Sequence, residues 1–466
     1  MIRINNLVMM HPKSKWITLV LMIYSQSILS QNVEIMGKLG ISTLSPNEGS
    51  QTILALDSFG FIGQRSAISL GVPMTGLIMS YDSTNISLTN AGFNKVGKFQ
   101  VSHQQFLQTG SFSELDTLNA PYVGGCAVWT GNEMLVWGGS ANSGAKYDPQ
   151  TNTWTTISAS GEPTPRSGYS CVWTGTNLLI WGGIDDNQNL LANGAKYNPT
   201  SDTWSNLSTI NVPVARVYHS SIWTGSEMII FGGMTSVGIN PNLTSAGARY
   251  NPVSDTWTAT SLSNTPAPTV FHSAVWAHDQ MIVYGGLNNF IIKKYNPITD
   301  TWTNGGNSDI RGYHTAVWTG SKMIVWGGIG TGNIPKNTGH IYDPTTNTLT
   351  NTSLGNAPSA RLYHSSTWTG KEMIVWGGST NVNGTTTLGN GAKFNPVTNT
   401  WITMSNINPP SPRCLHASVW TGNHNIIWGG IDSANSPLKT GCVYDVLGGI
   451  YEPSSNVDLY IYQKSF

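Results

Sequence analysis

Short runs of apolar residues alternate with polar, glycine-rich turns along most of this chain, and the alternation repeats. Seven times an apolar run ends in an aromatic residue followed by two glycines, with a tryptophan eight residues earlier. The aromatic residues are Trp137, Trp181, Phe231, Tyr284, Trp326, Trp376 and Trp428, and the earlier tryptophans are Trp129, Trp173, Trp223, Trp276, Trp318, Trp368 and Trp420. Most intervening segments begin Trp-Thr-Gly, and the Thr-Gly pair suits a tight turn. The pattern predicts seven two-stranded hairpins.

A second hairpin is predicted after each Gly-Gly pair. In most repeats a tyrosine or phenylalanine stands seven residues before a tryptophan, with an Asn/Asp-Pro turn between them. These pairs are Tyr147/Trp154, Tyr197/Trp204, Tyr250/Trp257, Tyr295/Trp302 and Phe394/Trp401. The fifth repeat has Leu349 in the tryptophan position, the seventh has Tyr451, and the fourth replaces Thr-Gly with Ala277-His278-Asp279. Each repeat is therefore four short strands.

The hydrophobic pattern also predicts how the repeats pack. Consecutive apolar residues in a strand indicate that both faces of its sheet are buried, so each sheet must lie between copies of itself. Radial stacking around an axis achieves this, and the repeated aromatic residues fill the wedges between sheets. We therefore predict an all-β, seven-bladed β-propeller; six blades with a degenerate seventh is the alternative.

These residues resemble a known repeat. The Gly-Gly pair, the tyrosine and the tryptophan seven residues later closely resemble the kelch repeat over residues 121–452. The resemblance implies a kelch-type propeller, whose relatives are mostly binding modules and in a minority oxidases or sugar-converting enzymes. The variant Trp-Thr-Gly-x-Glu-Met-Ile-Val-Trp-Gly-Gly is similar to that of exported proteins of unassigned role.

The two ends of the chain lie outside the repeats. Basic residues precede an apolar stretch at residues 16–29, and small residues follow, which is typical of a signal peptide over residues 1–30. That stretch is shorter than a membrane span and no other is long enough, so we expect a secreted or cell-surface protein. Residues 31–120 predict a small β-rich appendage, and residues 121–466 the propeller. The alternating segment 457–462 is expected either to supply the last blade's outer strand or to clasp the ring shut.

Composition narrows the possible partners. Charged residues make up 10% of the chain, and the 23 basic residues equal the 23 acidic ones. Without a basic excess, a nucleic-acid partner is not expected. The four cysteines, Cys126, Cys171, Cys414 and Cys442, lack zinc-site spacing, and they fit either two disulfides or four buried thiols.

One face of the predicted propeller carries loops of variable length. The segment from the second glycine to the Tyr/Phe position runs from 8 residues in the first repeat to 17 in the third. Such variation favours this side as the binding face. Before the first strand of most blades lies an arginine, and we consider five as ligand-binding residues at the channel mouth: Arg166, Arg216, Arg311, Arg361 and Arg413. They suit a carboxylate, a sulfate or an acidic sugar; alternatively, each bonds carbonyls of a neighbouring blade.

A histidine follows three residues after that position in five blades. These residues are His219, His272, His314, His364 and His416, and four of them (His219, His314, His364 and His416) join the arginines as candidate ligand-binding residues. Several histidines around an axis raise the possibility of a metal site, but a residue that recurs with the repeat is better explained by a bond at each strand start. The loop residues Asp185, Asp186 and Asn187 suggest a calcium site, with solvated carboxylates as the alternative. We predict no metal and no cofactor.

The function predicted from the sequence is that of an exported binding or adhesion protein. It captures an extracellular glycan or protein ligand on its variable-loop face, without catalysis. The alternative is a kelch-type enzyme, either a galactose-oxidase-like copper enzyme or a sialic-acid mutarotase or epimerase. Cys126 and Cys171 have no recognisable partner motif for a copper site. The mutarotase or epimerase would need a carboxylate for acid-base catalysis, and the binding-side loops offer few, chiefly Asp185, Asp186 and Asp432. A rigid surface spacer is a third possibility.

Overall fold

The computed structural model describes residues 110–464, with gaps at 123–124, 139–143, 406–407 and 447–449, and four strands between residues 53 and 107. The chain divides into two compact units. The propeller unit is Thr109–Gly448, and the terminal unit combines Met1–Gln108 with Gly449–Phe466. No helix of the described residues is long and apolar enough to cross a membrane. The predicted signal peptide lies outside the described residues.

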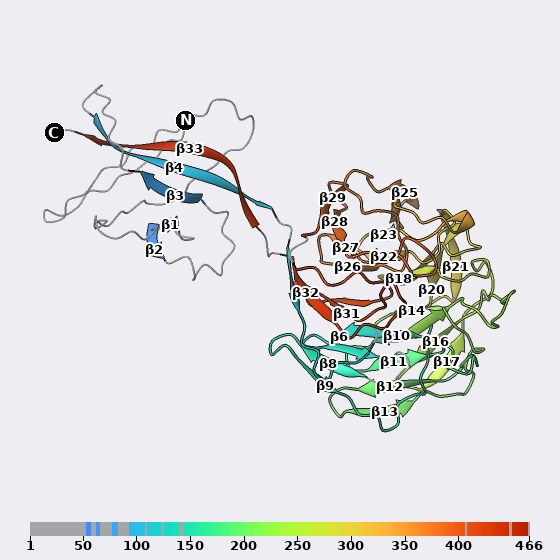
Figure 1. Ribbon diagram of the computed structural model, residues 1–466. Helices are drawn as coiled ribbons and strands as arrows, with labels where there is room; N and C mark the ends of the chain where they lie inside the picture. The colour runs from blue at the N-terminus through green and yellow to red at the C-terminus, as the bar shows by residue number, and fades with distance from the viewer. Residues whose placement is uncertain are drawn as a thin grey trace. The chain divides into compact units, whose positions relative to one another are not determined.

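The described part of the propeller unit forms seven four-stranded antiparallel sheets, which we number as blades 1–7 (Figure 1). Blade 1 is β6 (Cys126–Trp129), β7 (Met134–Trp137), β8 (Ala145–Asp148) and β9 (Thr153–Thr156); blade 2 is β10 (Ser170–Trp173), β11 (Leu178–Trp181), β12 (Gly194–Asn198) and β13 (Thr203–Asn206). Blade 3 is β14 (Ser220–Trp223), β15 (Met228–Phe231), β16 (Gly247–Asn251) and β17 (Thr256–Ala259); blade 4 is β18 (Ser273–Ala277), β19 (Gln280–Tyr284), β20 (Ile291–Asn296) and β21 (Thr301–Asn307). The seven-bladed prediction is confirmed, and the six-bladed alternative is wrong.

The remaining blades follow the same order. Blade 5 is β22 (Thr315–Trp318), β23 (Met323–Trp326), β24 (Gly339–Asp343) and β25 (Thr348–Asn351), with the 3₁₀ turn η1 (Thr331–Asn333) before β24. Blade 6 is β26 (Ser365–Trp368), β27 (Met373–Trp376), β28 (Gly391–Asn395) and β29 (Thr400–Thr403). Blade 7 is β30 (Ala417–Trp420), β31 (His424–Trp428), β32 (Gly441–Asp445) and β5 (Ser111–Glu114). The first strand of each blade contacts the first strands of both neighbours, which closes the ring.

The predicted turns explain why each blade forms where it does. In blade 2 the Thr174 hydroxyl accepts a hydrogen bond from the Asn177 backbone N–H at 2.9 Å, and Gly175 takes a φ of 95° that suits glycine. At the second turn the Tyr197 hydroxyl donates to Asp202 at 2.6 Å, and the Ser158 N–H of blade 1 donates to the same carboxylate oxygen at 2.8 Å. The turn residue therefore joins one blade to the next.

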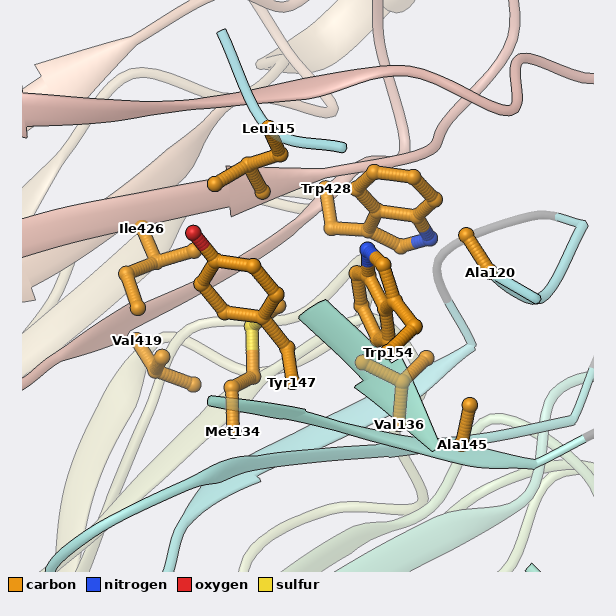
Figure 2. Packing of buried hydrophobic residues seen from close by; sticks show 10 residues of the cluster. All are labelled: Leu115, Ala120, Met134, Val136, Ala145, Tyr147, Trp154, Val419, Ile426 and Trp428. Atoms are coloured by element: carbon orange, nitrogen blue, oxygen red, sulfur yellow. The ribbon is translucent and has the colours of Figure 1, made fainter. Parts of the chain in front are cut away.

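Apolar clusters fill the wedges between blades. The second strands of blades 1, 2, 3, 5 and 6 are buried along their whole length, as predicted from their consecutive apolar residues. Between blades 7 and 1 the Trp154 and Trp428 rings lie 4.4 Å apart among Met134, Tyr147 and Ile426 (Figure 2). Aromatic pairs of this kind recur at five of the other six junctions, whereas the junction between blades 4 and 5 has Leu349 in the outer position.

The strand that completes blade 7 comes from before the first blade. β5 pairs with β32, with Phe112 opposite Tyr444, so Phe112 occupies the outer position that tryptophan fills in most blades. The prediction that the C-terminal segment supplies this strand is wrong, because that segment pairs with β4; the alternative that it clasps the ring stays a prediction. Tyr451 lies opposite Phe106 in that pairing and is not the outer residue of blade 7. Because strands from both ends of the propeller sequence share one sheet, backbone hydrogen bonds close the ring.

The described strands of the terminal unit form one five-stranded sheet. Its strands are β1 (Ile53–Leu56), β2 (Ile62–Arg65), β3 (Leu77–Asp82), β4 (Phe93–Leu107) and β33 (Ile450–Lys464), in the order β2-β1-β3-β4-β33. β4 and β33 are antiparallel partners over 15 residues each. The sheet thus combines chain from both ends of the protein. A folded appendage over residues 31–120 stays a prediction.

Candidate binding face of the propeller

The propeller has two faces with different connections. On the loop face lie the connections between second and third strands, such as residues 232–246 of blade 3, and those between blades, such as residues 260–272. On the turn face lie the short hairpin turns, such as the Thr224 turn. The predicted arginines and histidines all lie at the loop-face ends of the first strands. The structure therefore gathers the candidate residues on the variable-loop side, as their spacing predicts.

The arginines lie inside the blades and bond to backbone carbonyls. Arg216 is 1% exposed, and its Nη1 donates to the carbonyls of Gly232 at 3.2 Å and Ala246 at 2.6 Å, while its Nε donates to Val214 at 3.0 Å. The same Nη1 pair recurs at Arg166, Arg311, Arg361 and Arg413. Burial lowers the pKa of Arg216 to about 10, which leaves it charged at neutral pH. Contact with a ligand stays a prediction, and the geometry favours the structural alternative.

The histidines connect neighbouring blades. Nε2 of His219 lies 2.7 Å from the Ser170 hydroxyl of blade 2, and both side chains are buried. The same pairs are His272–Ser220, His314–Ser273, His364–Thr315 and His416–Ser365. Burial, with the Arg216 charge, lowers the pKa of His219 to about 3, so the ring is neutral at physiological pH. Among the described residues no group of three or more His, Cys, Asp or Glu side chains is arranged to hold a metal ion.

Two junctions replace the histidine link. Between blades 1 and 2 the corresponding positions are Cys126 and Tyr169, and a disulfide joins Cys126 to Cys171 with a Cα–Cα distance of 6.1 Å. The Tyr169 hydroxyl donates to the Trp137 carbonyl at 2.6 Å and accepts from the Cys126 N–H at 2.9 Å. Between blades 7 and 1 the same positions carry alanine and glycine. The described chain thus has one disulfide, whereas the sequence left two bridges or four thiols open.

The two remaining cysteines are buried thiols. Cys414 and Cys442 are not disulfide-bonded, and burial raises their pKa values to about 11 and about 12. Both therefore stay protonated at neutral pH, which makes them poor nucleophiles. Cys442 stands on a third strand where Ala195, Ala248 and Ala392 stand in other blades, so it acts as a small apolar side chain in the wedge.

Four aromatic side chains form the most distinctive feature of the loop face. We call Tyr218, Phe271, Tyr313 and Tyr363, one from each of blades 3–6, the aromatic ledge. Ring centroids lie 5.1 Å apart for Tyr218 and Phe271, 3.8 Å for the stacked Phe271 and Tyr313, and 4.8 Å for Tyr313 and Tyr363. Tyr218 is 45% exposed, and the others are half-buried. The ledge is a continuous row of rings at the start of the innermost strands.

The backbone of the ledge is held in an uncommon conformation. All four residues have φ between 55° and 58°, the left-handed region that L-residues rarely adopt. Inter-blade hydrogen bonds fix this geometry: the Tyr313 N–H donates to the Phe271 carbonyl at 3.1 Å, and the Tyr218 N–H donates to Gly168 at 2.8 Å. Blade 2 has Gly168 at this position, with a φ of 59°. Bulky side chains thus occupy positions that suit glycine, and Leu415 does the same in blade 7 with a φ of 55°.

The aromatic ledge was not predicted from the sequence, although its spacing is visible there. The residue before each candidate histidine is aromatic in four blades, in the spacing Arg/Thr-x-aromatic-His. The aromatic position lies between the arginine and the histidine that were predicted to bind a ligand. A half-exposed ring at a fixed repeat position is the feature that this face presents to solvent.

The loop carboxylates accept hydrogen bonds from within their own loops. Asp185 accepts hydrogen bonds from the N–H groups of Asn187 at 3.0 Å and Asn189 at 2.8 Å, and from the Asn189 side chain. These bonds hold its pKa below the ordinary value. Asp432 makes the same turn with the N–H groups of Ala434 and Ser436. The geometry accounts for both residues without a calcium ion.

One junction breaks the repeat symmetry. Between blades 4 and 5, Tyr284 stands in the place of tryptophan and donates to Asp309 at 2.9 Å, and its oxygen lies 2.6 Å from Nδ1 of His340. Asp309 also pairs with Arg311 and Lys336. Although burial raises it, the Arg311 and Lys336 contacts hold the Asp309 pKa well below its ordinary range. His340 stands where blades 2, 3 and 6 have alanine, and Leu349 stands where most blades have the outer tryptophan.

The fold and its loop face define a β-propeller of the binding or scaffold class. A family model described as the KLHDC2/KLHL20/DRC7 Kelch-repeats domain matches residues 124–310 and 313–448. The match covers more than half of the chain, and the chain belongs to the kelch-repeat propeller family. No curated protein matches the chain significantly.

Proposed function

We propose that this protein is an exported kelch propeller that captures an extracellular glycan or protein on its loop face, without catalysis. The observation that carries the proposal is the aromatic ledge. Tyrosine and phenylalanine supply rigid contact area at low entropic cost and are enriched in the centres of binding interfaces. The Tyr218 ring also offers a hydroxyl at the edge of an apolar surface, which suits ligands with mixed polar and apolar groups, whereas the Tyr363 hydroxyl donates to the Val382 carbonyl at 3.2 Å.

Export is supported by two independent features. The predicted signal peptide precedes the repeats, and the Cys126–Cys171 disulfide joins two blades of the propeller. Structural disulfides persist in oxidising compartments and are rare in reducing ones. We infer that the protein works on the cell surface or in the surrounding medium. The buried, neutral histidines and internally bonded arginines support a role of the repeat residues as scaffold rather than as catalytic groups.

A binding screen with a turnover assay tests the proposal. The purified full-length protein is applied to a glycan array containing neutral, sialylated and uronic-acid sugars, and to surface proteins of the producing cells. Saturable binding without product, lost when Tyr218 and Tyr363 are replaced by glycine, is the expected outcome. Product formation from a bound sugar would instead identify a sugar-converting enzyme. Binding that is unchanged by both substitutions would show that the ligand site lies outside the aromatic ledge.

A further inference from the structure

The turn face contains a small hollow at the junction of blades 4 and 5. It is lined by residues 277–280 of the β18–β19 turn, by Trp318 and Ser321 of blade 5, and by residues 344–345 of the β24–β25 turn. Trp318 is half-buried, and it packs on the apolar cluster between the two blades while also lining the hollow. The hollow lies on the opposite face from the aromatic ledge, so it is independent of the proposed loop-face site.

The turn beside this hollow departs from the repeat. In the other six blades the matching turn has glycine, with φ between 92° and 110°, and a Cβ built there meets no atom within 4 Å. Blade 4 has His278 instead, with a φ of 61°. Histidine, asparagine and aspartate adopt this left-handed region more readily than other non-glycine residues. The His278 side chain is therefore tolerated in this turn, and it is specific to blade 4.

The His278 ring forms a fixed wall of the hollow. Its Nε2 lies 2.7 Å from the carbonyl oxygen of Gly320 in blade 5, so the ring bridges the two turns. It stands perpendicular to the Trp318 indole, with centroids 5.6 Å apart and an interplanar angle of 85°. Asp279, next in the chain, is exposed and lines the same hollow. An indole, an imidazole wall and a carboxylate thus meet at one place.

We propose that this hollow binds a single uncharged sugar ring. Its volume of about 220 Å³ is below the roughly 300–1,000 Å³ typical of pockets for drug-sized ligands, which suits one ring. The indole offers an apolar surface for the C–H groups of a pyranose. Asp279, Gln280, Ser321 and Thr345 supply acceptors and donors for its hydroxyls. Because the lining includes a carboxylate and neither lysine nor arginine, acidic sugars are disfavoured.

Ligand-observed NMR titration of the full-length protein tests this site. The probes are galactose, glucose, mannose and N-acetylglucosamine, with glucuronic acid and choline as comparison ligands. We expect saturable binding of at least one neutral sugar with Kd on the order of 1 mM, and weaker binding of both comparison ligands. No detectable binding of any neutral sugar, or tighter binding of glucuronic acid or choline than of the neutral sugars, would overturn the proposal.

Variants built from the repeat itself make the test specific. The combined changes Ala277→Thr, His278→Gly and Asp279→Ser install the Thr-Gly-Ser turn of blade 5 in blade 4, so the fold should persist. Sugar affinity should fall at least tenfold, and it should also fall with Trp318→Phe. Trp223→Phe, the equivalent change in blade 3, and Tyr218→Gly on the loop face should leave it unchanged. Binding that survives the turn replacement, or is lost with Tyr218→Gly, would contradict the proposed site.

Discussion

At the scale of single residues, the repeated arginine and histidine act on the backbone and on neighbouring blades. Arg361 directs five hydrogen bonds to Ser359, Gly377 and Asn390, at 2.8 to 3.0 Å. The guanidinium fork holds both ends of the loop between the second and third strands. This geometry fixes the loop bases from which the variable segments extend.

Removing one such arginine should destabilise the propeller. Arg361→Ala leaves buried carbonyls without donors, and we expect the free energy of unfolding to fall by about 2–4 kcal/mol. Urea unfolding followed by fluorescence measures the change. Lys371→Ala, which removes an exposed positive charge from the turn face of the same blade, is the matched control and should have little effect. If Arg361→Ala leaves the free energy of unfolding unchanged but abolishes ligand binding, Arg361 contacts the ligand instead.

The buried histidines should make stability depend on pH. Their pKa values are lowered by burial, to about 3 for His219, His314 and His416 and to about 4 for His272, against about 6.5 in the unfolded chain. Between these values the unfolded chain binds more protons than the folded one. Stability is therefore highest above pH 6.5 and falls on acidification, by up to about 1.4 kcal/mol per pH unit per histidine.

Thermal unfolding between pH 7.5 and 5.0 measures this dependence. The melting temperature should decrease steadily below pH 6.5, and substituting His219 and His416 by glutamine should flatten the decrease. A melting temperature that is constant over this range would show that the histidines are not buried as neutral rings.

Residue positions were more predictable than side-chain directions. The repeat places Arg216 and His219 at the loop-face end of a strand, and the structure agrees. Whether a guanidinium reaches the channel or a carbonyl depends on rotamer and neighbouring loop, which one sequence does not specify. Tyr218 was not among the residues predicted to bind a ligand, which were all arginines and histidines. Its positive φ, visible only in the structure, distinguishes it.

At the scale of elements, the junctions between blades differ in a systematic way. Five junctions use a histidine and a hydroxyl, one uses Tyr169 with the Cys126–Cys171 disulfide, and the junction between blades 7 and 1 has Ala417 and Gly125 at these positions. The disulfide joins blades 1 and 2, beside the junction between blades 7 and 1. It encloses a sequence separation of 45 residues, so it removes conformational freedom from the unfolded chain.

Loss of this disulfide should lower stability. The paired changes Cys126→Ser and Cys171→Ala should lower the free energy of unfolding by about 2–4 kcal/mol. Reductant should lower the melting temperature of the wild type but not of this variant. Cys442→Ala, which removes a buried thiol outside the disulfide, is the control, and reductant should still lower its melting temperature. A wild-type melting temperature that reductant leaves unchanged would exclude a stabilising bridge.

Strand positions were predictable because the repeat recurs seven times, but the closing strand was not. β5 contains one aromatic residue, Phe112, and precedes the first Gly-Gly pair, so no repeat spacing marks it. The segment at 457–462 alternates more clearly, and it looked like the better candidate. Backbone pairing across the ring decides between them, and that pairing joins residues more than 300 positions apart, such as Cys442 and Glu114.

At the scale of the whole molecule, near-symmetry of the scaffold contrasts with asymmetry of its surfaces. Every blade is a four-stranded antiparallel sheet, yet the aromatic ledge occupies blades 3–6 and gives way to Gly168 in blade 2. The His278 turn likewise occurs in one blade. A propeller whose core repeats while selected surface positions vary is suited to presenting a few specific contacts on a rigid frame.

Titration of the loop-face ligand against ledge variants tests the central claim most directly. The glycan or protein found in the binding screen is titrated by calorimetry into the wild type and into Tyr218→Gly and Tyr363→Gly. Glycine already occupies this position in blade 2, so both variants should keep or raise the melting temperature while affinity falls at least tenfold. Wild-type affinity in both stable variants would contradict a loop-face site built on the aromatic ledge.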